Sequence, residues 1–184
     1  MKLRILTALA FFTLVGHQLS AQDREFVNPI IKNYGGILDL PDVDVKPDPD
    51  MEYKILIEEI FKMDRPDRVN FSAMNVARLI NLHAVGGVKK ENLKVTLVIH
   101  GMATNTVVNS EAYQGKYSEV EENPYIKLYK ELAESGVELI VCGQSLTLQG
   151  HTKADVIPEV KIATSALTAV TTYQLKGYAY FKWD

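Results

Sequence analysis

The sequence predicts an α/β protein whose mostly parallel, five-stranded sheet is covered by helices on both faces. Two observations lead to this prediction. After residue 50, apolar runs of strand length alternate with longer stretches of helical character, and glycines end most of these segments. The chain has 184 residues, of which 47% are hydrophobic and 23% are charged, as is typical of one globular domain. Strands that alternate with helices form βαβ units, which build parallel sheets.

Apolar runs predict the positions of the strands. The first is residues 53–61, which contain enough apolar and aromatic side chains for a strand, although a helix is possible. The other predicted strands are residues 93–100, 137–142, 159–163 and 178–183, and the last is rich in aromatic residues.

Three longer segments between these strands predict helices. Residues 68–85 have a mostly apolar face, and residues 124–135 begin with a proline, which suits a first helical turn. The third helix starts after a cap at Thr164 or Ser165 and runs to residue 174. A short helix over residues 144–148 is possible, whereas residues 102–123 are expected to be rich in loops.

The first 21 residues carry the three parts of a secretory signal peptide. Lys2 and Arg4 are positive, residues 5–15 are apolar apart from threonines, and a more polar stretch ends in small residues at Ala21. The apolar part is too short to span a bilayer, and no amphipathic period favours the alternative of an N-terminal core helix. We therefore expect cleavage after Ala21, giving a periplasmic or secreted protein with no stable membrane anchor.

Residues 22–50 are expected to form an extended arm ahead of the folded domain, residues 51–184. Residues 39–50 are rich in proline and aspartate, which disfavour helices and central strands. Two arrangements are open: a disordered linker, or an arm that docks on the domain or on a neighbouring subunit. The apolar side chains available for docking are Phe26, Val27, Ile30, Ile31 and Tyr34.

Charge and motifs exclude several classes of function. A net charge of -3 with scattered basic residues argues against binding of nucleic acid or anionic lipid. Neither Cys-x-x-Cys nor His-Glu-x-x-His spacing occurs, so no metal site is predicted. The sequence also lacks the glycine-rich phosphate and dinucleotide motifs and the Gly-x-Ser-x-Gly of esterases. No cofactor is therefore expected, and a flavin would rest on analogy of fold alone.

The only cysteine, Cys142, ends the third predicted strand, and His100 ends the second. Parallel strands place their carboxyl ends at one edge of the sheet, where α/β proteins bind ligands. If the two strands are neighbours, these residues share one cleft, in which a histidine and a helix N-terminus favour the reactive thiolate. We predict that His100 and Cys142 are catalytic. The alternative is a buried structural cysteine and a histidine that only caps a strand. The predicted substrate-binding residues flank the pair: Gly101, Gly143, Gln144 and Ser145.

Five segments, taken in order, carry a resemblance to a known family: residues 75–83, 93–101, 123–124, 132–145 and 174–180. Together they resemble the DsrE/DsrF family over about residues 51–184. The resemblance implies a flavodoxin-like, three-layer fold and assembly into trimers or hexamers. For active members it also implies a strand-end cysteine that carries sulfur as a persulfide, and Cys142 matches that position. The sulfur-relay members compared are cytoplasmic, whereas this chain carries an export signal.

The sequence therefore predicts an exported sulfur carrier or sulfurtransferase that uses Cys142, with His100 aiding proton transfer. The expected partner is a sulfur donor or acceptor protein, or a small polysulfide. Because the chain has one cysteine, a relay from Cys142 must end on another molecule. The alternative is a non-enzymatic, oligomeric binding or assembly module in which the cysteine is structural.

Overall fold

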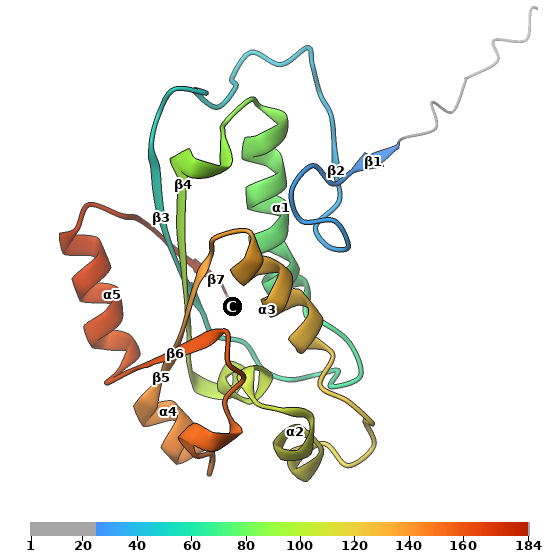
Figure 1. Ribbon diagram of the computed structural model, residues 1–184, viewed down its shortest axis with the longest axis vertical. Coiled ribbons are helices and arrows are strands. Elements are labelled where there is room, and N and C mark those ends of the chain that lie inside the picture. Colours follow the sequence, from blue (N-terminus) through green and yellow to red (C-terminus); the bar gives the residue numbers. More distant parts are fainter. Residues whose placement is uncertain (1–24, 184) are drawn as a thin grey trace, which may run out of the picture.

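The computed structural model describes residues 25–183, and its centre is one parallel five-stranded sheet (Figure 1). The strands are β3 (Tyr53–Glu59), β4 (Leu93–Ile99), β5 (Glu138–Cys142), β6 (Val160–Ala163) and β7 (Ala179–Trp183). Their order across the sheet is β6-β5-β4-β3-β7, and every neighbouring pair is parallel. The predicted α/β class and the mostly parallel sheet are confirmed, and the first apolar run is a strand.

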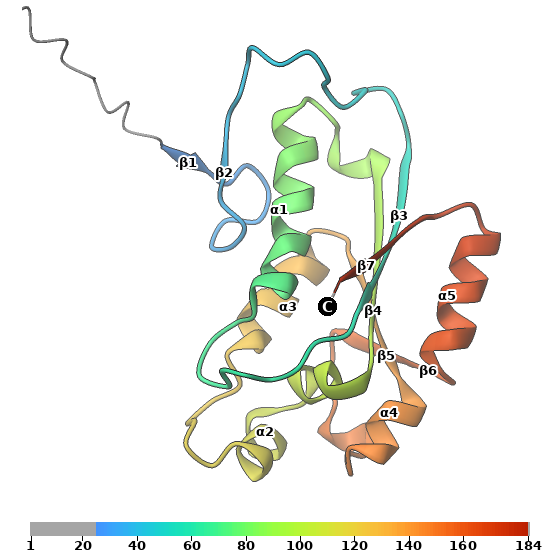
Figure 2. The same ribbon diagram turned by 180° about the vertical axis from the view of Figure 1, so that it is seen from behind.

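Helices cover the two faces of the sheet and complete three layers. α1 (Phe71–Val85) and α3 (Tyr125–Glu134) lie on one face, and α5 (Ala166–Leu175) lies on the other (Figures 1 and 2). The larger apolar core lies between the sheet and the α1/α3 layer. A smaller core joins α5 to the opposite face and includes Leu56, Val98 and Ile140. Successive strand residues therefore point to different helical layers.

Local capping explains where the helices begin. The Asn70 side chain accepts a hydrogen bond from the Ser72 amide, so α1 starts at Phe71 rather than at residue 68. Of the two expected caps for α5, Ser165 is the one observed. The segment expected to be rich in loops contains two helices, the 3₁₀ helix η2 (Gly101–Val107) and α2 (Ser110–Lys116). The Asn109 side chain caps α2, a local signal in the sequence that the prediction missed.

The remaining elements are short. β1 (Phe26–Val27) and β2 (Ile37–Leu38) form an antiparallel pair in the arm. α4 (Gly143–Leu148) follows β5 directly, so the short helix starts one residue earlier than expected. The other 3₁₀ turns are η1 (Lys90–Asn92) and η3 (Lys153–Asp155).

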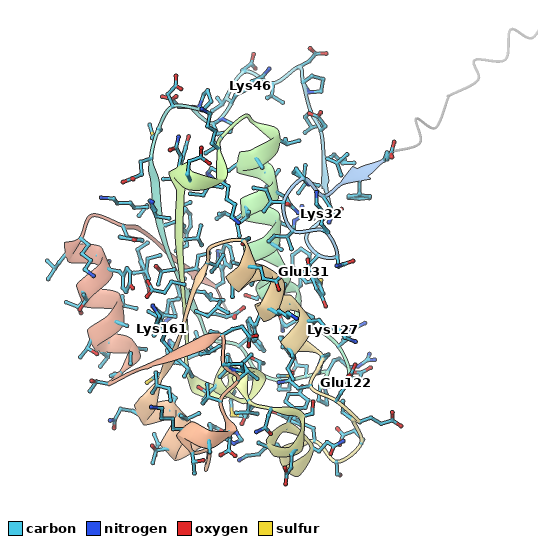
Figure 3. The ribbon with its side chains drawn as sticks, viewed as in Figure 1. Lys32, Lys46, Glu122, Lys127, Glu131 and Lys161 are labelled. Atoms are coloured by element: carbon cyan, nitrogen blue, oxygen red, sulfur yellow. The ribbon has the colours of Figure 1, made fainter. Side chains whose placement is uncertain are left out.

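Residues 25–38 of the arm pack against α1 and α3. Asn81 of α1, which is fully buried, accepts hydrogen bonds from the Ile30 and Ile31 amides and donates to backbone carbonyls of the arm. Glu131 of α3 accepts hydrogen bonds from Asn33, and Figure 3 shows Glu131 facing this part of the arm. Ile31 also joins the larger core. The predicted signal peptide and its cleavage site lie outside the described residues.

Within residues 25–183, no helix is both long enough and apolar enough to cross a membrane.

Candidate functional site

The carboxyl edge of the sheet brings His100 and Cys142 to neighbouring positions. β4 and β5 pair in the register Val98 with Ile140 and Ile99 with Val141. His100 follows β4 in an extended conformation, so the next position in the register sets it across from Cys142. Because side chains alternate along a strand, His100 and Cys142 lie on the same face of the sheet as Val98 and Ile140, the face that α5 covers.

Cys142 is the N-cap of α4, and its sulfur is surrounded by hydrogen-bond donors. The Ser145 amide donates to Sγ at 3.4 Å. Burial raises the pKa of the Cys142 thiol, but hydrogen bonds from the Ser145 hydroxyl and from the Ser145, Ala166 and Gln144 amides outweigh it, so the pKa is lowered. The residue is only 4% exposed. The site therefore favours a thiolate and leaves it little contact with solvent.

Ser145 links the turn after His100 to the thiol. The Gly101 amide donates to Ser145 Oγ at 3.1 Å, which leaves the hydroxyl proton free to point to Cys142 Sγ. Gly101 has φ +60, a left-handed conformation that favours glycine, and the turn depends on it. Gly101 and Ser145 thus support the thiol through hydrogen bonds.

Gly143 and Gln144, also predicted to bind substrate, have different surroundings. A Cβ on Gly143 would lie 2.7 Å from the Ala163 carbonyl oxygen, so its glycine allows β6 to approach closely. The Gln144 side chain is exposed to solvent, while its amide faces the sulfur of Cys142.

His100 is hydrogen-bonded to Glu58, a residue that the sequence analysis did not select. Nε2 of His100 lies 2.7 Å from Glu58 Oε1, and these side chains are 18% and 14% exposed. Glu58 Oε2 accepts a hydrogen bond from the Tyr180 hydroxyl of β7. Within the described chain, the hydrogen bonds of the His100 ring include none to Cys142.

The Glu58 carboxyl is held in its charged form. Burial acts to raise its pKa, but hydrogen bonds from Tyr180 and His100, together with the charges of His100 and Lys182, lower it below the usual value. The sequence does hold one sign of this residue. Two glutamates stand near the end of the predicted strand 53–61, as a histidine and a cysteine end the next two predicted strands.

Hollows flank this edge on both sides. One has a volume of about 750 Å³ and contains Gly101, Met102 and Lys182 among its lining residues. The other, about 670 Å³, is lined by Gly143, His151 and Lys161, which Figure 3 places on β6. A small donor molecule therefore has space on either side of the strand ends, although Cys142 itself does not line either hollow.

Between residues 25 and 183, no group of three His, Cys, Asp or Glu side chains lies close enough together to hold a metal ion.

His151, to which the sequence analysis gave no role, is 8% exposed and pairs through Nε2 with Asn105 Oδ1 at 2.8 Å. Burial and the nearby charge of Lys116 lower its pKa, so it is a neutral, structural contact between η2 and the end of α4.

Comparison with known proteins identifies the family. Among solved structures, the chain is similar to MTH1491, a protein of unknown function from Methanobacterium thermoautotrophicum. The identity is 21% and the TM-score is 0.47, and the match covers 71% of this chain and 99% of that one. A search of curated proteins returns no match. The model of the DsrE/DsrF-like family matches residues 60–183, a range that contains His100 and Cys142. The chain therefore belongs to the DsrE/DsrF-like family.

Proposed function

We propose that this protein is an exported sulfur carrier that holds sulfane sulfur as a persulfide on Cys142. Membership of a family linked to sulfur relay supports the reaction class. The observation that carries the proposal is the set of amide and hydroxyl donors around Cys142 Sγ, because thiolate is the form that attacks sulfur. Export rests on the predicted signal peptide alone.

The proposed reaction exchanges one S–S bond for another. The Cys142 thiolate attacks the outer sulfur of a donor persulfide, R–S–SH, and forms the new S–S bond of Cys142–S–SH. The S–S bond of the donor breaks, and its electron pair leaves with RS⁻. An acceptor thiolate then attacks the outer sulfur and releases the Cys142 thiolate. No oxidant or reductant is consumed, and the acceptor must be another molecule because the chain has no second cysteine.

The proposal is tested by treating the purified protein with polysulfide and measuring its mass. The wild type is expected to gain the mass of one or more sulfur atoms, whereas Cys142→Ser gains none. A donor-free sample and a sample then treated with a reducing thiol are the controls, and the thiol should return the original mass. No added sulfur on the native wild type would end the proposal.

A structural cysteine in an oligomeric binding module is the second candidate, and a specific observation favours it. Cys142 is 4% exposed and packs with Ala166 and Ala169 of α5. This candidate predicts a thiol that resists a small alkylating probe in the folded state, and oligomer size and partner binding that survive Cys142→Ser. Rapid alkylation of the native thiol would rule against it.

A further inference from the structure

The Glu58 and His100 side chains form a hydrogen-bonded pair, and each oxygen of the Glu58 carboxylate has a hydrogen-bond partner. Oε1 bonds to His100 Nε2 at 2.7 Å, and Oε2 accepts from the Tyr180 hydroxyl. Lys182 lies directly across from Glu58 in the β3–β7 register and adds a positive charge. The carboxylate is thus fixed from two neighbouring strands, β4 and β7.

A carboxylate that is hydrogen-bonded to one nitrogen of a histidine ring fixes which nitrogen carries the proton. Ionised Glu58 can only accept, so neutral His100 must carry its proton on Nε2 and keep a lone pair on Nδ1. The same carboxylate stabilises the imidazolium that forms when Nδ1 takes up a proton. Glu58 therefore fixes the tautomer of neutral His100 and leaves Nδ1 as its proton-accepting atom.

The register places this pair beside the thiol. His100 is one position beyond the Ile99–Val141 pair, across from Cys142, and neighbouring strands lie about 4.8 Å apart. The groups next to His100 on the two strands that flank β4 are Glu58 on β3 and Cys142 on β5, while Tyr180 and Lys182 on β7 lie beyond Glu58. Of these, Cys142 is the group whose proton must move in the proposed reaction.

We propose that Glu58 is a positioning residue that orients neutral His100 as the proton acceptor for Cys142, in a carboxylate–imidazole–thiol arrangement. The inference rests on the proposed persulfide function of Cys142. His100 takes the thiol proton, giving imidazolium and thiolate. When the S–S bond of the donor breaks, the same proton neutralises the departing RS⁻, and His100 returns to its neutral form.

Glu58→Gln is the test, with Glu59→Gln as the matched control, because residue 59 is the same amino acid on the other face of the strand. Two measurements need no sulfur donor: the pH profile of Cys142 alkylation by iodoacetamide and the NMR titration of the His100 ring. Glu58→Gln should change the nitrogen shifts of the His100 ring, because the Gln amide can donate as well as accept and so no longer fixes the tautomer. It should also move the alkylation midpoint upward and slow sulfur uptake about tenfold to a hundredfold.

The Glu59→Gln control should keep the wild-type alkylation and His100 profiles. Glu58→Asp, which keeps the charge but shortens the side chain, gives an intermediate result and serves if Glu58→Gln does not fold. Unchanged His100 and thiol profiles in these Glu58 variants would overturn the inference, as would a wild-type thiol that resists alkylation at every pH. A wild type that is alkylated normally but takes up no sulfur contradicts only the proposed function.

Discussion

Glu58 and Glu59 are neighbours in β3, yet the fold gives them opposite surroundings. Glu58 points to the α5 face, where His100 and Tyr180 both hydrogen-bond to its carboxylate. Glu59 points into the larger core between the sheet and α3, is 0% exposed, and has no hydrogen-bond partner on either oxygen among the described residues. The alternation of side chains along a strand is enough to separate the two.

The comparison shows that partners, rather than burial alone, decide the charge of a carboxyl. The two glutamates have pKa values displaced in opposite directions. For Glu58, hydrogen bonds outweigh burial and lower the pKa, whereas burial without partners raises the pKa of Glu59 to about 8. At neutral pH the first is ionised and available to His100, and the second is mostly protonated.

Glu59 is surrounded by groups that do not relieve this burial. Tyr125 and Tyr129 of α3 lie near enough for its negative charge to raise their pKa values, and Trp183 lies across from it in β7. Ionised Glu59 therefore destabilises the folded state.

Glu59→Gln should have the largest effect on stability, and only at high pH. Since the folded-state pKa of Glu59 is raised, the contribution of its protonated form to the stability of the wild type is fully present below pH 4.5 and is lost as the pH rises to about 8. The full shift corresponds to about 5 kcal/mol as an upper bound. The variant should lose this dependence and become the more stable protein at pH 9, measured by urea unfolding at fixed protein concentration.

Low pH provides the control for this prediction. At pH 4 both side chains are neutral, so Glu59→Gln and the wild type should unfold within about 1 kcal/mol of each other. Parallel stability curves for the two proteins from pH 5 to 9 would mean that Glu59 has found a partner or water, and the contrast with Glu58 would be lost.

The contrast between the glutamates could not be predicted from the sequence, although the elements around them could. Apolar runs and glycine breaks were enough to locate the strands, and hence to place His100 and Cys142 at strand ends. The pair at residues 58–59 is two identical side chains at the end of one such run, with no pattern to say which faces the larger core. The Tyr180 hydroxyl reaches Glu58 only because β7 pairs with β3, and these two residues are 122 positions apart in the sequence. Pairing at that distance leaves no local sign.

Glu58→Gln should have a smaller effect on stability, with the opposite dependence on pH. The lowered pKa of Glu58 means that its stabilisation is present above the unfolded value of 4.5 and is lost as the pH falls through the folded value. The variant should be less stable than the wild type by roughly 1.5–3 kcal/mol near pH 7, the usual contribution of a hydrogen bond to a charged group.

As the pH falls below 4.5, the difference in stability between Glu58→Gln and the wild type should shrink, because the unfolded state then takes up a proton more readily than folded Glu58 does. Urea unfolding at pH 3.5 and 7 measures both values. If instead the gap widens toward acid, then Glu58 stabilises the fold without its charge, and the account of His100 positioning loses its basis.

Tyr180→Phe should produce the smallest change of the three. It removes the donor to Glu58 Oε2, but Tyr180 is 38% exposed, so water can replace the hydroxyl. We expect a loss of less than about 1 kcal/mol in stability near pH 7 and a small upward shift in the pKa of Glu58.

The pKa of Tyr180 in the wild type provides a second measurement, because its hydrogen bond to Glu58 raises this pKa to about 12. In Glu58→Gln, ultraviolet titration should find this tyrosine ionising near its ordinary value of 10. A tyrosine that keeps its high value without the Glu58 charge would show that the two side chains do not share a proton, which leaves His100 as the sole partner of Glu58.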